Sequence, residues 1–157
     1  MQTLSNFPAT RQAGLDLLSK FSPQAGPDYA RGHNFDFGPN QPRAVSGLSP
    51  FVRRRLVTEQ ELITEVLKQH SADAAEKFIQ EVFWRSYWKG WLELRPTVWQ
   101  SYQTGLRGAW NAIQTQDGLE RNWRTACMGN TGIDCFDSWA KELSSTGYLH
   151  NHARMWF

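Results

Sequence analysis

Residues 78–88 read FIQEVFWRSYW, and their spacing decides what kind of fold the chain has. Intervals of three, four and three residues place one set of side chains on a single helix face: Phe78, Glu81, Arg85 and Trp88. An acid and a base therefore lie between two aromatic rings. Two interpretations stay open. Buried charges would call for a polar ligand in an aromatic pocket, whereas an exposed Glu81–Arg85 ion pair would contribute only about 0.3–0.5 kcal/mol.

The helical period recurs along the whole chain, and no run of β-branched residues alternates as a strand would. Each predicted helix has a recognisable start or stop. Helices are expected after Thr10, from the cap Ser49 with Pro50, after Thr58 with Glu61 as a capping box, from Ser71 to about Leu94, from Pro96, from Asp134 to Gly147, and from about Leu149. The predicted fold class is all-α.

Apolar side chains form one stripe on several of these helices. The stripes are Leu15, Leu18 and Phe21; Leu62, Ile63, Val66 and Leu67; and Trp99, Tyr102, Leu106, Trp110 and Ile113. Because large aromatic residues dominate the packing of small helical domains, most of the eight tryptophans are expected in the core.

A long connection, residues 22–47, is rich in Pro, Gly, Asn and Asp and far exceeds the length of an ordinary turn. Its interleaved aromatics Tyr29, Phe35 and Phe37 favour a packed loop that wraps a surface. At 157 residues the chain is expected to form a single domain over 1–157.

The composition excludes several classes of function. A net charge of +2 provides no overall field for nucleic acid or anionic membranes, and Arg53–Arg55 point in different directions on a helix. Cys127 and Cys135 have no nearby partners for a zinc site, so no metal is expected and both are interpreted as buried structural residues. No apolar run approaches the ~20 residues that cross a bilayer, and a cytoplasmic location is expected.

Two further stretches carry polar groups suited to a ligand. Val45–Pro50, VSGLSP, places two hydroxyls directly before a helix, where backbone N–H groups can receive a phosphate, although ordinary capping explains the same residues. Near the end of the chain, Asn151, Arg154 and Met155 are predicted to share a helix face, with a solvated helix start as the alternative.

In this order, three stretches resemble the helical flavin-binding domain of the DNA photolyase and cryptochrome family. They are SGLSPFVRRRLVTEQEL (46–62), EVFWRSYW (81–88) and GNTGIDCFDSWAKELSSTGYLHNHARM (129–155). The resemblance covers about 29–157 and corresponds to the N-terminal part of such a domain. It implies a truncated member of a short subgroup without the antenna domain.

The resemblance implies an FAD cofactor, that is, a flavoprotein chromophore. The residues that it assigns to FAD are Tyr29, Val45, Ser46, Leu48, Ser49, Phe78, Glu81, Arg85, Asn151 and Arg154. It assigns DNA contacts to Glu81, Trp84, Asn151, His152 and Met155, and catalysis to Glu81, Trp84 and Asn151. The implied activity is that of a lyase for DNA repair, in which light drives an electron from reduced FAD to a flipped-out pyrimidine dimer.

Several positions depart from the family pattern. Val45, Phe78, Ser86 and Tyr148 stand where the family often has Thr, Trp, Glu and Trp. His152 replaces an arginine expected at DNA phosphate, so flavin binding is the better supported function. The alternative is a catalytically inactive helical module that forms a homodimer or binds a complementing chain through an exposed aromatic face.

Overall fold

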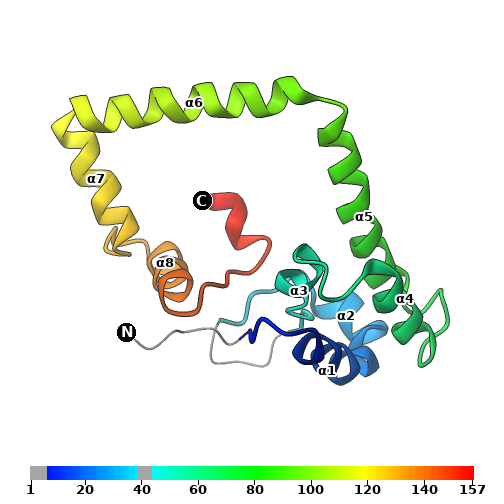
Figure 1. Cartoon of the computed structure of the whole chain (residues 1–157). Helices are drawn as coiled ribbons and strands as arrows, with labels where there is room; N and C mark the ends of the chain where they lie inside the picture. The colour runs from blue at the N-terminus through cyan, green and yellow to red at the C-terminus, as the bar shows by residue number, and fades with distance from the viewer. Residues whose placement is uncertain (1–6, 39–43) are drawn as a thin grey trace. The chain divides into compact units, whose positions relative to one another are not determined.

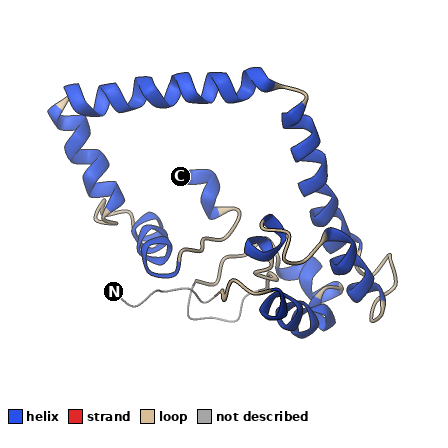
Figure 2. Cartoon of the chain, in the orientation of Figure 1, coloured by secondary structure: helices blue, strands red, loops and turns tan. Residues whose placement is uncertain are grey.

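The structure is a computed structural model that describes residues 7–38 and 44–157. Within those ranges all regular structure is helical, which confirms the all-α class (Figure 2). With η for a 3-10 helix, the elements are α1 Arg11–Phe21, η1 Ser22–Gln24, α2 Pro27–Gly32, α3 Ser49–Arg53, α4 Glu59–Leu67, α5 Glu76–Glu93, α6 Pro96–Thr115, α7 Asp117–Cys127, α8 Asp134–Thr146 and η2 Ala153–Trp156 (Figure 1). Among the described helices, none is both long and apolar enough to cross a membrane.

The described residues divide into two compact units. The first comprises 7–38 and 44–88, and the second comprises 89–157. Helix α5 begins in the first unit, and its last turn belongs to the second. The single domain expected over 1–157 stays a prediction, and its residues 1–6 and 39–43 lie outside the described part.

The first unit packs α1, η1, α2, α3, α4 and the start of α5 around one apolar core. Its buried members are Leu18, Phe21, Ala25, Tyr29, Leu48, Phe51, Val52, Val57, Leu62, Val66, Ala75, Phe78 and Val82. Leu15 and Ile63 pack partly buried against this core, as their stripes predict. Leu67 is 44% exposed, so its predicted place on the buried stripe is wrong: it is the last residue of α4, beyond the part that packs.

The predicted helix starts in the first unit are right where a side chain caps the helix. Thr10 accepts a hydrogen bond from Ala13 N at 3.2 Å, and Thr58 and Glu61 form the expected capping box. Ser71 accepts a bond from Ala74 N at 3.2 Å, but only turns follow it and α5 begins at Glu76.

The connection predicted over 22–47 contains more regular structure than expected. It begins with η1 and the six-residue helix α2, whose first turn holds Pro27. Proline presets a helical φ and needs no donor at that position. Tyr29 of α2 is buried, and its ring lies 6.0 Å from that of Phe21, so one predicted aromatic of the loop is a core residue of a helix.

In the second unit, α6 and α7 meet at Gln116 and α8 ends as predicted. Gly147 follows α8 with φ +68, the left-handed conformation of a helix C-cap. Helix α7 is not among the predicted helices, although Leu119, Trp123, Ala126 and Cys127 follow helical spacing. The helix predicted from about Leu149 is instead the short η2, which begins at Ala153.

Two expectations about burial are wrong. None of the eight tryptophans is buried, and six of them are exposed: Trp84, Trp88, Trp99, Trp110, Trp123 and Trp156. Both cysteines are exposed as well. Aromatic spacing along a helix indicates an apolar face, but a second surface has to cover that face before it is buried.

Candidate functional site

The Val45–Pro50 stretch forms a turn that leads into α3. Gly47 has φ +66, and Ser46 Oγ accepts a hydrogen bond from Leu48 N at 3.2 Å. Helix α3 begins at Ser49 with Leu48 at the cap position, so the prediction that Ser49 caps the helix is wrong. The hydroxyl of Ser49 is exposed and makes no hydrogen bond to the described residues, whereas Val45 packs partly buried against the core.

Three residues assigned to FAD by the resemblance are part of the core of the first unit. Tyr29, Leu48 and Phe78 are 8%, 2% and 4% exposed. The rings of Tyr29 and Phe78 meet edge to face at 5.3 Å between centroids. Their side chains pack within this core, and their contacts to FAD stay a prediction.

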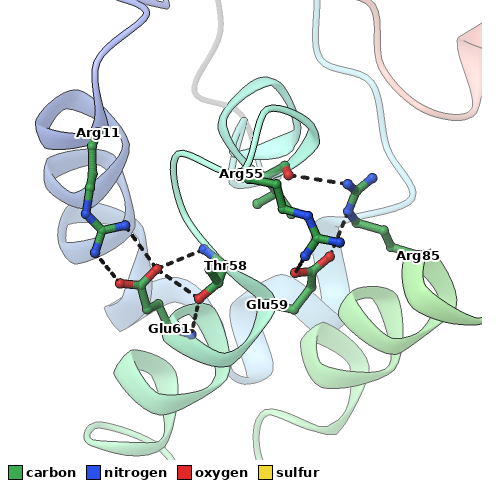
Figure 3. Close-up of polar contacts among 7 residues, drawn as sticks. Arg11, Arg55, Thr58, Glu59, Glu61 and Arg85 are labelled. Carbon is green, nitrogen blue, oxygen red and sulfur yellow. Dashed lines mark hydrogen bonds and ion pairs between the residues drawn. The ribbon is translucent and has the colours of Figure 1, made fainter. Parts of the chain in front are cut away.

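The charged pair predicted on α5 does not form. Glu81 is exposed and makes no ion pair with a described residue. Arg85 instead donates from Nε to Glu59 Oε1 at 3.1 Å and from Nη2 to the carbonyl oxygen of Val52 at 3.3 Å (Figure 3). Arg85 is half-buried, and its partners Glu59 and Val52 belong to α4 and α3.

Glu59 is the residue at the centre of this arrangement, and sequence analysis missed it. Its other oxygen, Oε2, accepts from Arg55 Nη1 at 3.1 Å (Figure 3). Burial raises the pKa of Glu59, but its own backbone N–H, the charge of Arg55 and the bond and charge of Arg85 outweigh burial and leave the pKa below its ordinary value. The i, i+4 spacing of Arg55 and Glu59 could have indicated their ion pair from the sequence, whereas Glu59 and Arg85 are 26 residues apart and no local pattern joins them.

A second ion pair joins α1 to the start of α4. Arg11 binds the carboxylate of Glu61 (Figure 3). It also donates to the carbonyl oxygen of Leu56 at 2.8 Å. The Arg11 hydrogen bond, followed by those from the backbone and hydroxyl of Thr58, lowers the pKa of Glu61 to about 2. Both carboxylates at the start of α4 are therefore ionised at neutral pH and favourably placed at a helix N-terminus.

A shallow, mostly apolar hollow of about 310 Å³ lies between α4 and α5. Its lining residues are Glu59, Gln60, Ile63, Thr64, Val82, Phe83 and Ser86. Ligand pockets usually range from about 300 to 1,000 Å³, so this hollow is small, and none of the predicted FAD residues lines it.

Exposed aromatic rings gather on α5 just beyond Glu81. Trp84, Tyr87 and Trp88 are 49%, 55% and 49% exposed. The Trp84 ring lies 6.3 Å from Trp88 in a stacked arrangement and 5.4 Å from Tyr87 edge to face. The first unit thus presents Glu81 and Trp84, two predicted catalytic residues, to solvent on the same helix.

The predicted residues near the end of the chain belong to the second unit. Arg154 Nη2 donates to Asn151 Oδ1 at 3.2 Å, so these two residues lie together. His152 and Met155 are both exposed, Met155 by 73%. Asn151 lies in the turn before η2, which begins at Ala153, so the single helix face predicted for Asn151, Arg154 and Met155 does not form.

The carboxylate of Asp137 holds the loop that precedes α8. Asp137 accepts from the backbone N–H of Thr131 at 2.8 Å, from its hydroxyl at 2.7 Å and from Gly132 N at 2.9 Å. Burial raises the pKa of Asp137, but these hydrogen bonds and the charge of Lys141 prevail and lower it. The loop is therefore ordered by local contacts within the second unit.

Comparisons with known proteins agree with this architecture. Residues 78–157 match the family described as the FAD binding domain of DNA photolyase. The chain is 27% identical over 146 residues to a deoxyribodipyrimidine photo-lyase of Streptomyces griseus, covering 92% of this chain and 29% of that protein. It is 23% identical over 119 residues to the enzyme of the same name from Vibrio cholerae, covering 71% of this chain and 24% of that protein. The chain thus spans about a quarter of the length of these relatives, and no solved structure matches it significantly.

Proposed function

The chain belongs to the family of the FAD-binding domain of DNA photolyase, and from this premise we propose that it takes part in light-driven repair of damaged DNA. FAD is the cofactor of this family, and the chain is a photolyase-like flavoprotein. When bound and reduced, FAD supplies an electron on illumination. The residues of this chain would bind and orient the cofactor and the DNA.

The hydrogen bonds of Arg85 are the observation that carries the proposal. Its Nε and Nη2 atoms are held by Glu59 and Val52, whereas Nη1 makes no hydrogen bond to a described residue. A guanidinium held on one edge can offer its other edge to phosphate or carbonyl oxygens. Ser46 in the turn before α3 and Ser49 at the first position of that helix would add hydroxyls, and Arg85 contacts the same helix through Val52.

The polar groups of the first unit fit an anionic cofactor. Arg55 and Arg85 share the single carboxylate of Glu59, so this cluster retains one net positive charge. Such a local excess attracts the pyrophosphate of a dinucleotide. The resemblance also assigns Asn151 and Arg154 to FAD, and within the second unit this amide and guanidinium lie together.

The proposal extends to the binding of damaged DNA. A lesion taken out of the base stack would place its flat face on Trp84, which is half exposed, with Glu81 three residues away to supply a hydrogen bond or proton. Stacking on an aromatic ring contributes about 1–3 kcal/mol per base. The resemblance assigns further DNA contacts to Asn151, His152 and Met155 of the second unit.

The experiment that tests FAD binding uses the whole chain. We expect FAD added to the purified protein to survive gel filtration and to show the flavin absorption bands. Arg85→Ala is expected to retain much less FAD, whereas the matched variant Arg107→Ala should retain as much as the wild type, because among the described residues the Arg107 side chain hydrogen-bonds only to Thr104 of its own helix. A wild-type protein that emerges colourless would contradict the proposal. Illumination with DNA that carries a pyrimidine dimer then tests repair.

A second candidate function is partner binding without catalysis, and α6 favours it. Trp99, Tyr102, Leu106 and Trp110 are 48–61% exposed along one helix, in a pattern typical of an apolar face that meets another surface. A homodimer or a complementing chain would cover it. Sedimentation velocity separates the two functions: a protein that stays monomeric while binding FAD would exclude self-association as its role.

A further inference from the structure

Glu59 connects two arginines that come from different parts of the first unit. Its carboxylate lies at the first residue of α4, accepts Arg85 Nε on one oxygen and accepts Arg55 Nη1 on the other, both at 3.1 Å (Figure 3). The Glu59 side chain is 18% exposed, against 30% for Arg85 and 60% for Arg55. The link to Arg85 is therefore the better shielded of the two, and the better able to hold a fixed geometry.

The hydrogen-bond inventory of Arg85 shows what this link leaves available. A guanidinium has five N–H donors in a rigid planar fork. Glu59 takes the Nε donor and the Val52 carbonyl takes one donor of Nη2. Two contacts on one edge of a rigid plane determine the direction of the whole plane, so the Nη1 edge has a defined direction as well.

We propose that Glu59 is the positioning residue of Arg85, holding its Nε edge so that its Nη1 edge is presented to the phosphate or carbonyl oxygens of FAD. This inference rests on the proposed function, because it takes FAD as the ligand of Arg85. Without Glu59, Arg85 keeps only the bond to Val52, and its long side chain regains rotamer freedom that FAD binding would then have to remove.

The same contacts extend the effect of Glu59 to α3. Arg55, which follows this short helix, has φ +58, an uncommon conformation for a residue with a side chain. Its side chain is bound by Glu59, and its backbone N–H donates to the Val52 carbonyl that also receives Arg85. Glu59 therefore holds both arginines at the C-terminal end of α3, the helix that begins at Ser49.

Glu59→Gln is the variant that tests the inference, with Glu65→Gln as its control. Glu65 lies on the same helix and also pairs with a basic residue, Lys68, at 2.5 Å, but it does not contact Arg85. We expect Glu59→Gln to weaken FAD binding about tenfold, because the loss of the charged hydrogen bond that holds Arg85 outweighs the attraction from the cluster's added positive charge, and Glu65→Gln to leave it unchanged. FAD affinity is measured by quenching of flavin fluorescence with the whole chain.

A second measurement needs no FAD. The exchange rate of the Arg85 Nε–H proton, followed by NMR in the protein alone, reports whether that donor is held. Faster exchange is expected in Glu59→Gln and an unchanged rate in Glu65→Gln. If the proton exchanges as slowly in Glu59→Gln as in the wild type, Glu59 does not hold Arg85 and the inference is wrong.

A double-variant cycle links the two measurements. In an Arg85→Lys background, which lacks the Nε donor, adding Glu59→Gln should cause no further loss of FAD affinity. An equal additional loss in that background would show that Glu59 acts independently of Arg85, and would overturn the inference. A wild-type chain that fails to bind FAD would overturn the proposed function, while the exchange rate would still decide whether Glu59 holds Arg85.

Discussion

Helix α4 has nine residues and buries Leu62 and Val66, whereas α6 has twenty residues and buries none. Both helices carry an apolar face, and that of α6 is the longer one. The difference lies in what each face meets: α4 packs into the core of the first unit, but Trp99, Tyr102, Leu106 and Trp110 of α6 stay about half exposed. An apolar pattern thus predicts a helix and its apolar face, whereas the stability that this face contributes to the fold depends on whether another element covers it.

The largest expected effect comes from truncating one leucine in each helix. Leu62 is 3% exposed and Leu106 is 53% exposed. Leu62→Ala should lower the free energy of unfolding by about 2–5 kcal/mol, because it removes buried methyl groups and leaves a cavity. Leu106→Ala should change it by no more than about 0.5 kcal/mol. Urea unfolding measures both.

Equal losses of unfolding free energy for the two leucine variants would contradict the difference in burial between α4 and α6. Such a result would mean that the α6 face is covered in solution. Unfolding of Leu106→Ala would then be repeated at several protein concentrations. A loss of unfolding free energy that grows with concentration would identify association as the cause of the coverage.

Helix glycines provide the second test, with a smaller expected effect. A Cβ at Gly14 of α1 would lie 2.7 Å from Val57 Cγ2 and 2.9 Å from Phe51 Cδ1, whereas a Cβ at Gly108 of α6 would meet nothing within 4 Å. Gly14→Ala should therefore lower the free energy of unfolding by about 1–3 kcal/mol through overpacking. Gly108→Ala should raise it by about 0.4–1 kcal/mol by restricting the unfolded chain. Thermal unfolding followed by circular dichroism shows whether each variant is stabilised or destabilised. A destabilising Gly108→Ala would argue against an α6 surface with free space at Gly108.

The smallest effect concerns pH and the start of α4. Glu61 has a pKa of about 2 in the folded chain, against 4.5 for an unperturbed glutamate. A lowered pKa in the folded state stabilises the protein above the unfolded value, so this contribution is complete above about pH 4.5 and disappears as the pH falls toward 2. Glu61→Gln should flatten the acid side of the stability profile. The ion pair with Arg11 is exposed, which keeps the effect modest.

Glu81→Gln is the matched control for the pH profile. Glu81 is exposed and has no ion pair among the described residues, so its variant should follow the wild-type profile. A profile for Glu61→Gln that still parallels the wild type between pH 5 and pH 2 would show that other carboxylates, such as Glu59 or Asp137, dominate the acid loss.

The candidate site was predictable where its residues are close in sequence. The Thr58–Glu61 capping box and the approach of Asn151 to Arg154 both join residues three apart. The partner of Arg85 was not predictable, because Glu81 on its own helix and Glu59 on another helix carry the same charge and only packing chooses between them. The family resemblance identified FAD as the cofactor, but it could not show which of its assigned residues are core residues and which reach solvent.

The sequence by itself determined the helical class and the helix boundaries set by caps, including Thr10, Thr58 and Gly147. Those features depend on contacts within one or two turns, so local residue types are enough to specify them. Only the tertiary structure decided that α4 is buried, that α6 is exposed and that Arg85 binds Glu59. Each of these depends on which surfaces meet across many intervening residues, and the free energy of that choice comes from the packing of the whole unit.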